Sequence, residues 1–197
     1  MRRIVVVNHL TLDGVMQGPG RPDEDTRDGF RHGGWAATRQ DDVMNARLGR
    51  GMAECGALLL GRRTYLDFAG YWPRQRENPY TEVLDRTEKY VVSTTLRDPL
   101  PWRNSVLLPG DPVESVAELR AGPGDDVCVM GSGELVRALL RHDLIDEMLL
   151  MIHPLILGTG RRLFDDSLDV SAMTLVEAVP TTTGVLLATY RPESRGA

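Results

Sequence analysis

The sequence has few cysteines, few aromatic residues, no excess of positive charge and no long apolar run. Its 197 residues include two cysteines whose spacing fits neither a disulfide framework nor a metal site, so we expect a reducing, cytoplasmic setting. The net charge of −5 argues against nucleic acid or an anionic membrane as a partner. No apolar run approaches the roughly 20 residues of a membrane span. The four histidines show no ligand spacing either, so no metal is predicted.

Apolar runs alternate with helical patterns along most of the chain. Hydrophobic residues make up 42% of the sequence, enough for the core of one domain covering residues 1–197. Strands are predicted at 4–10, 57–60, 89–95, 105–108, 126–130 and 146–154, with an antiparallel pair at 173–179 and 185–190. Helices are predicted at 41–55, from Thr64 onward, at 112–119 and at 131–140. This order predicts an α/β fold with a mixed, mostly parallel sheet, flanked by helices and ending in an antiparallel C-terminal edge.

A long polar segment interrupts this alternation between residues 18 and 38. It is rich in Gly, Pro, Asp and Arg and shows no period. A loop of this length in a compact domain is commonly functional, so we interpret it as a flap over a ligand site. Trp35 within the flap could stack on a planar ring, or it could anchor the loop to the core.

Three strand ends carry residues that suit an anion. Gly61-Arg62-Arg63-Thr64 places two guanidinium groups at the start of a helix, where unpaired N–H groups and the helix dipole favour negative charge. Ser93-Thr94-Thr95 offers hydroxyl donors, and Gly131-Ser132-Gly133 lets backbone N–H groups approach a ligand. Such strand ends share one edge of an α/β sheet, so all three could surround one dinucleotide. Each alone is more often structural, and neither a G-x-G-x-x-G nor a P-loop motif is present.

These segments, together with two others, resemble the dihydrofolate reductase superfamily. The resemblance is specifically to the branch that contains the C-terminal reductase domain of the bifunctional riboflavin-biosynthesis enzyme. The matching segments are residues 12–14, 61–65, 89–94, 129–134 and 154–164. Since the resemblance runs from roughly residue 4 to residue 191, it implies a dihydrofolate-reductase-like fold for nearly the whole chain.

What the resemblance implies first is an NADPH site. Arg62 or Arg63, together with Ser93 and Thr94, would hold the adenosine 2′-phosphate. Thr64 and the helix it begins would hold the pyrophosphate. The turn at 61–64 contains no acid that would repel the extra phosphate, which favours NADP over NAD.

The second part of the implied site is the turn near residue 132. Gly131, Ser132 and Gly133, with the helix that continues through Glu134, would contact the diphosphate and the nicotinamide. Ser132 departs from the family pattern, which has a glycine at this point of the turn.

Substrate contacts are less well defined. His9 and Asp13 lie near the end of the first strand, close to the implied nicotinamide, and Trp35 lies in the flap, but each also has an ordinary structural interpretation. Folate reductases carry an acid on the helix after the flap. Neither Asp41 nor Asp42 can be aligned with that acid, and both suit the first turn of a helix. No catalytic residue is therefore assigned.

Together these features predict an NADPH-dependent reductase. It would transfer a hydride to a small planar heterocycle of the pterin or aminopyrimidine type, or to an imine, like 5-amino-6-(5-phosphoribosylamino)uracil reductase or dihydrofolate reductase. Two alternatives stay open, a non-catalytic nucleotide-binding or ligand-sensing protein on the same fold and a reductase that uses a flavin or deazaflavin. The family branch often pairs through its C-terminal strands, so the resemblance also implies a homodimer.

Overall fold

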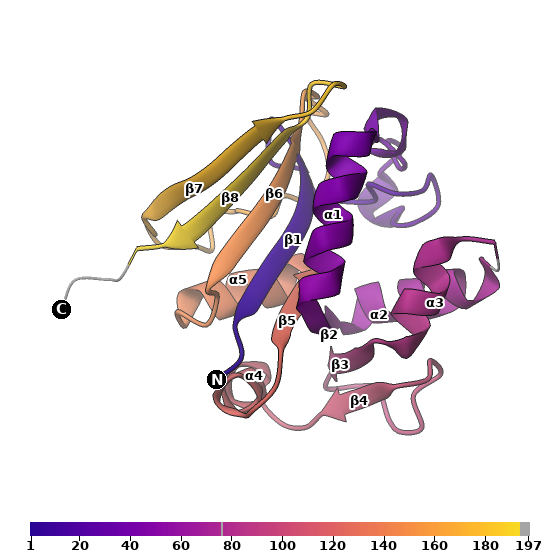
Figure 1. Ribbon diagram of the computed structural model, residues 1–197, viewed down its shortest axis with the longest axis vertical. Coiled ribbons are helices and arrows are strands. Elements are labelled where there is room, and N and C mark those ends of the chain that lie inside the picture. The colour runs from indigo at the N-terminus through magenta and orange to yellow at the C-terminus, as the bar shows by residue number, and fades with distance from the viewer. Residues whose placement is uncertain (76, 194–197) are drawn as a thin grey trace.

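Eight strands form one mixed sheet in the computed structural model, which describes residues 1–75 and 77–193. Their order across the sheet is β4-β3-β2-β5-β1-β6-β8-β7 (Figure 1). The strands are β1 Ile4–Thr11, β2 Cys55–Gly61, β3 Glu88–Val92, β4 Ser105–Leu108, β5 Asp126–Met130, β6 Glu147–His153, β7 Met173–Pro180 and β8 Leu186–Pro192.

The sheet is parallel from β4 to β6 and antiparallel beyond β6. β1 lies between β5 and β6 and pairs in parallel with both, whereas β8 pairs antiparallel with β6 and with β7. Both strands that flank β1 come from the second half of the chain, and the segments that join them to β1 are long enough for the crossover that parallel pairing needs. The predicted fold class, a mostly parallel sheet with an antiparallel C-terminal edge, is confirmed.

Five helices of the described chain cover the two faces of the sheet (Figure 1). They are α1 Asp42–Glu54, α2 Arg62–Tyr71, α3 Pro79–Arg86, α4 Pro112–Ala121 and α5 Gly133–Arg141, and 3-10 turns lie at Arg27–Gly29, Ala37–Arg39 and Trp72–Arg74. Buried residues of α4 and α5 join one core cluster, and those of α1, α2 and α3 join the cluster on the opposite face. The connections between strands therefore supply both outer layers.

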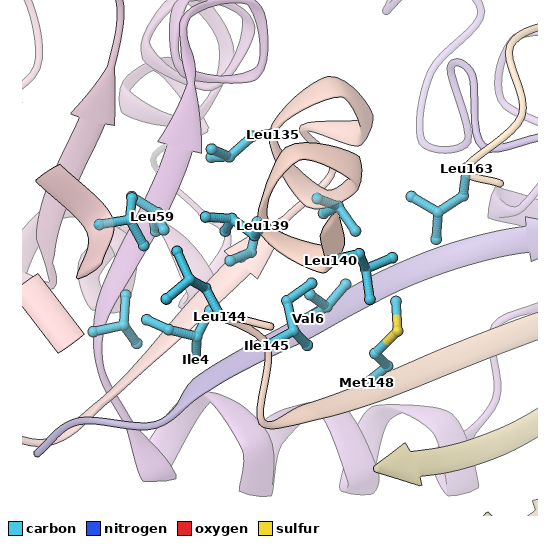
Figure 2. Packing of buried hydrophobic residues seen from close by; sticks show 14 of the residues in the cluster. Ile4, Val6, Leu59, Leu135, Leu139, Leu140, Leu144, Ile145, Met148 and Leu163 are labelled. Carbon is cyan, nitrogen blue, oxygen red and sulfur yellow. The ribbon is translucent and has the colours of Figure 1, made fainter. Parts of the chain in front are cut away.

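The core beneath α5 shows why this helix docks firmly. Leu135 and Leu139 belong to one face of α5, and both are buried against the sheet, near Val6 and Leu59 (Figure 2). Burial of one leucine side chain contributes about 2 kcal/mol to the stability of the folded protein. This packing fixes the N-terminus of α5 next to the end of β5, where the candidate site lies.

The structure corrects three expectations. Helix α3 was missed, although Asn78 accepts a hydrogen bond from the Tyr80 amide at the helix start, and a proline in the first turn is a standard start signal. Thr64 does not begin α2, because the helix starts at Arg62 with Gly61 as its N-cap.

The third correction concerns the cysteines. Cys55 and Cys128 are joined in a disulfide, so the inference that they would not pair was wrong. The two residues are 73 apart in sequence, but β2 and β5 are neighbours, which brings their Cα atoms to 5.8 Å. A register shift between Cys55 and Ala57 accompanies the pair.

Candidate functional site

The three predicted strand ends lie side by side. β3, β2 and β5 are consecutive in the sheet, and all three run in the same direction. Gly61 ends β2 level with Val92 of β3, which places Ser93 directly beside the 61–64 turn. On the other side, β5 ends at Met130 and leads into Gly131. One edge of the sheet thus collects all of the residues proposed for cofactor binding.

Ser132 connects two of these turns. Its amide donates a hydrogen bond to Thr64 Oγ1 at 3.1 Å, and its own Oγ accepts one from the Gly61 amide at 3.0 Å. The Ser132 and Thr64 hydroxyl oxygens are also 3.1 Å apart. The start of α2 and the turn before α5 are therefore held in a fixed relative position by side chains that sequence reasoning had assigned to a ligand.

The turn before α5 has an unusual backbone. Gly131 has a φ of +57°, and Ser132, the residue preceding α5, is also left-handed with a φ of +53° and a ψ of 44°. A Cβ at Gly131 would lie 3.1 Å from Thr64 Cγ2, tighter than an ordinary contact. Both the left-handed conformation and the limited space therefore favour glycine at position 131. By contrast, a Cβ at Gly61 would be 3.6 Å from Ser132, which is ordinary contact.

Two arginines at the start of α2 face different surroundings. Arg63 lies 4.0 Å from the Glu134 carboxylate on α5, and Arg161 lies 3.8 Å from the same carboxylate. Within residues 1–75 and 77–193, no ion pair involves Arg62, whose side chain is exposed. The helix starts are thus rich in guanidinium groups, and the one acid there, Glu134, is partly neutralised.

The strand end after β3 forms a tight turn of its own. Ser93 Oγ accepts hydrogen bonds from the amides of Thr95 and Leu96 at 3.1 and 3.0 Å, and it lies 3.5 Å from the Thr95 hydroxyl oxygen. Thr94 is exposed. Arg97, which sequence reasoning missed, folds back to the Thr94 carbonyl at 3.3 Å and adds another cation to this corner.

His9 contacts a second histidine. Its Nδ1 lies 2.9 Å from Nε2 of His153, which is completely buried. Burial, with a smaller contribution from His153, lowers the pKa of His9 to about 3. Burial, with a contribution from the positive charge of Arg39, lowers the pKa of His153 to about 4. Both rings are therefore neutral at physiological pH.

Trp35 anchors the loop that the sequence marked as a flap. The indole is 8% exposed, donates from Nε1 to the Gln17 carbonyl at 2.7 Å, and packs edge-on against His153 with ring centroids 5.1 Å apart. It also belongs to a small core with Val15 and Phe30. Of the two interpretations left open by the sequence, the structure therefore favours the anchor.

Asp13 is hydrogen-bonded to a neighbouring loop. Its Oδ1 accepts from the Thr11 hydroxyl at 2.6 Å, and its Oδ2 accepts from the Gly158 amide at 2.9 Å. Burial pushes the pKa of Asp13 upward, but these hydrogen bonds outweigh it and hold the pKa below its ordinary value. Both oxygens are engaged by the protein itself, so Asp13 is positioned to fasten the loop after β6 rather than to face a substrate.

Asp41, at the start of α1, has a structural role. Asp41 is the N-cap, and its carboxylate accepts from the Met44 amide at 2.9 Å and from the amide and hydroxyl of Thr182 at 2.6 Å each. It joins α1 to the turn between β7 and β8. Asp41 is therefore not free to contact a substrate in the way described for folate reductases, whereas Asp42, the first residue of α1, is exposed.

The predicted flap is a packed loop in this structure. Arg21 forms an ion pair with Asp67 of α2 and lies 4.1 Å above the Tyr71 ring. Gln17, another residue that sequence reasoning missed, donates to the Asp25 and Arg27 carbonyls at 3.2 and 3.1 Å. The loop is thus joined to the helix that carries Arg62, so it borders the candidate site.

A known family matches almost the whole chain. The model of the RibD C-terminal domain covers residues 2–187. This chain belongs to the RibD C-terminal domain family. Its place in the riboflavin-biosynthesis branch of the dihydrofolate-reductase-like superfamily, predicted from the motifs, is thereby confirmed. The family and the fold are those of reductases.

Relatives of this RibD C-terminal domain protein agree with the assignment. The uncharacterized protein YyaP of Bacillus subtilis (strain 168) is 27% identical over 199 residues, which cover 96% of this chain and 94% of YyaP. A pyrimidine reductase-like protein from Corynebacterium diphtheriae has a TM-score of 0.65 at 11% identity, with 98% and 92% of the two chains covered.

Two further solved structures share the fold. Dihydrofolate reductase from Enterococcus faecalis, solved in complex with NADP(H), has a TM-score of 0.61 at 12% identity, with 98% of this chain and 97% of that chain covered. The deaminase and 5-amino-6-(5-phosphoribosylamino)uracil reductase of Thermotoga maritima has a TM-score of 0.64 at 17% identity, and 98% of this chain matches 57% of that one. At these identities the likeness shows the fold alone.

A metal cluster and a membrane-spanning helix are both absent from the described residues. No cluster of three or more His, Cys, Asp or Glu side chains there could hold a metal ion. Among the helices of residues 1–75 and 77–193, none has the length and apolar character needed to cross a membrane.

Proposed function

We propose that this protein is an NADPH-dependent reductase. The observation that carries the proposal is the meeting of three anion-suited turns, at residues 61–64, 93–94 and 131–133, along one edge of the sheet. Two helix N-termini, exposed guanidinium groups and several hydroxyl groups there fit a cofactor that carries several phosphates. When bound, NADPH would supply the hydride, and the chain would position the acceptor beside it.

The same residues divide the proposed cofactor site into two parts. Arg62, with Ser93 and Thr94, would hold the 2′-phosphate, since Arg63 turns toward Glu134 at 4.0 Å on the opposite side. Arg63 and the amides at the start of α2 would then serve the pyrophosphate. Thr64 would act mainly through Ser132, to which it is hydrogen-bonded.

The second part of the site is the turn before α5. Gly131, Ser132 and Gly133 would face the diphosphate and nicotinamide, because this turn follows the strand that neighbours β1. Glu134 would remain paired with Arg63 and Arg161. Its charge would then be balanced close to the diphosphate.

The proposed acceptor is a small planar heterocycle, of the pterin or aminopyrimidine kind, or an imine. Family membership supports this class, and the Corynebacterium and Thermotoga proteins are named for pyrimidine chemistry. The activity would accordingly resemble 5-amino-6-(5-phosphoribosylamino)uracil reductase or dihydrofolate reductase.

We include a homodimer and a cytoplasmic location in the proposal. β7 is an edge strand whose Leu175 and Val176 side chains are 52% and 47% exposed, which favours pairing with a second copy. A reductase of this kind would draw on the intracellular NADPH pool. The Cys55–Cys128 disulfide is unusual for a reducing compartment, so alkylation in intact cells tests the location, and recovery of both residues as free thiols would support the cytoplasm. A disulfide recovered from intact cells would contradict the location.

Calorimetric titration with NADPH and NADH tests the cofactor. We expect NADPH to bind more tightly, and Arg62→Ala to remove most of that preference while Arg74→Ala, a change of another exposed arginine, leaves it intact. A lack of NADPH binding would refute the proposal, and binding of a flavin or deazaflavin instead would support the alternative reductase. NADPH binding without turnover of any pterin, aminopyrimidine or imine would favour a non-catalytic sensor.

A further inference from the structure

Two histidines from neighbouring strands form a pair beside the proposed site. His9 of β1 is level with Met151 of β6, and His153 is level with Thr11, so the two side chains lie diagonally on one face of the sheet. The distance from His9 Nδ1 to His153 Nε2 is 2.9 Å, which is a hydrogen bond. Asn8, the residue before His9, donates to the Gly131 carbonyl at 3.1 Å. Strand β1 therefore passes next to the turn before α5, and the histidine pair lies on the face of β1 opposite to Asn8, Val6 and Leu10.

The protonation of the pair follows from its burial. Both pKa values are lowered far below 6.5, so each ring carries a single N–H at neutral pH. One of those two protons lies in the bond between the rings. The other belongs either to His153 Nδ1 or to His9 Nε2, and the two possibilities present opposite groups to a ligand.

The surroundings of His153 decide between these possibilities. Its Nδ1 is buried and has no hydrogen-bond partner among the described residues, and the ring packs edge-on against Trp35. A buried N–H without an acceptor is rarer and more costly than a buried lone pair without a donor. His153 therefore carries its proton on Nε2 and donates it to His9 Nδ1. His9 is then protonated on Nε2.

We propose that the Nε2–H group of His9 is a hydrogen-bond donor to the acceptor substrate, and that His153 is the positioning residue that fixes this tautomer. Unlike His153, His9 keeps part of its side chain exposed. No partner for its Nε2 lies in the part of the chain that the structure describes. The role in catalysis rests on the proposed reductase function, whereas the tautomer does not.

This arrangement selects the chemistry of the ligand. A neutral imidazole N–H recognises a lone pair, such as a ring carbonyl oxygen or an unprotonated ring nitrogen, and it discriminates against an amino group at the same place. The carboxylate of Asp41, which could have favoured an amino group, is occupied by Met44 and Thr182. We therefore infer an oxo-substituted heterocycle, rather than a diamino-substituted one, as the acceptor class.

The tautomer can be measured on the unliganded protein. In a long-range proton–nitrogen correlation spectrum of protein labelled with 15N-histidine, His9 should show an unprotonated Nδ1 and a protonated Nε2. His153 should show a protonated Nε2. The opposite assignment for His9 would overturn the proposal, whatever cofactor the protein uses.

Ligand selection is tested with two probes of matched shape, lumazine with two ring oxo groups and 2,4-diaminopteridine with two amino groups. In calorimetry, with and without NADPH, lumazine should bind at least about tenfold more tightly, because a misplaced amino group leaves buried donors facing each other. His9→Phe should abolish that preference. Equal binding of the two probes, or binding of neither, would overturn the proposal.

Two variants of His153 separate positioning from folding. His153→Gln keeps an N–H near the position of Nε2 and should retain most of the preference for lumazine. His153→Leu has similar bulk without a donor and should lose it, with His9 shifting toward the other tautomer in the nitrogen spectrum. If both variants behave like the wild type, His153 does not position His9. If lumazine selection depends on His9 but NADPH does not bind, the proposed function fails while this inference stands.

Discussion

Ser132 shows how one residue can serve both the fold and the site. Its left-handed backbone would suit glycine better, at a cost of about 1–2 kcal/mol for any other residue. The hydrogen bonds of its hydroxyl group with the Gly61 amide and the Thr64 hydroxyl offset that cost by joining the two turns. The departure from glycine at this position thus gives this chain a side-chain connection that glycine lacks.

Two substitutions at Ser132 separate strain from bonding. Ser132→Ala keeps the strained backbone and loses the contacts of the hydroxyl, so its free energy of unfolding should fall by about 1–2 kcal/mol. Ser132→Gly loses the same contacts but relieves the strain, so it should be more stable than the alanine variant. Urea denaturation measures both. An alanine variant at least as stable as the glycine variant would show that the left-handed backbone carries no cost.

The histidine pair predicts a pH dependence of stability. Both folded pKa values lie below the unfolded value of 6.5. Above pH 6.5 both histidines are therefore neutral in the folded and the unfolded chain, and they impose no loss of stability. As pH falls below 6.5, the unfolded chain binds protons that the folded chain does not, and stability declines until about pH 4 for His153 and about pH 3 for His9.

Removing one histidine should flatten this decline. Between pH 6 and 5, His153→Gln should reduce the slope of unfolding free energy by up to about 1.4 kcal/mol per pH unit. His142→Gln, at an exposed histidine, is the matched control and should leave the slope close to that of the wild type. Chemical denaturation across this range checks it, and identical slopes for all three proteins would rule out the lowered pKa values.

At the scale of elements, the loop at residues 18–38 is fastened to α2 by one side chain. Arg21 reaches Asp67 and covers Tyr71, and the second oxygen of Asp67 is buried without a partner among the described residues. The carboxylate therefore depends on Arg21 for compensation. A movement that carries Arg21 away from α2 has to break this contact.

Arg21→Ala should therefore release the loop. We expect a loss of about 2–4 kcal/mol of stability, because a partly buried carboxylate is left unpaired. Amide hydrogen exchange should accelerate within residues 18–38 while β1 stays protected. Adding Asp67→Asn to the first change should recover part of the stability. If the double variant is no more stable than Arg21→Ala alone, the pairing with Asp67 is not what holds the loop.

The elements also show what the sequence could predict. The three strand-end turns were predictable because glycine, arginine and hydroxyl residues follow apolar runs directly, as at Gly61 and Ser93. The start of α3 had its signal in Asn78, which was overlooked. The His9–His153 contact was beyond reach, because it depends on the register of two strands whose residues are 144 apart. The Cys55–Cys128 pair was hidden for the same reason.

At the scale of the whole molecule, the free edge of the sheet predicts self-association. Leu175→Lys on β7 should shift the molar mass measured by light scattering from that of a dimer to that of a monomer, since a charge opposes burial of the edge. Val170→Lys, at a position 98% exposed outside the strands, should leave the mass unchanged. A monomeric wild type would contradict the proposed homodimer.

The central position of β1 has a consequence for how the protein is made. Strand β1 is synthesised before its partners β5 and β6, whose residues follow more than a hundred positions later. Contacts so distant in sequence slow folding, and a strand without neighbours is prone to aggregation meanwhile. Chains truncated before β5 should therefore leave β1 without either neighbour, and such products should depend on chaperones. The centre of the sheet can close only after β6 has emerged from the ribosome.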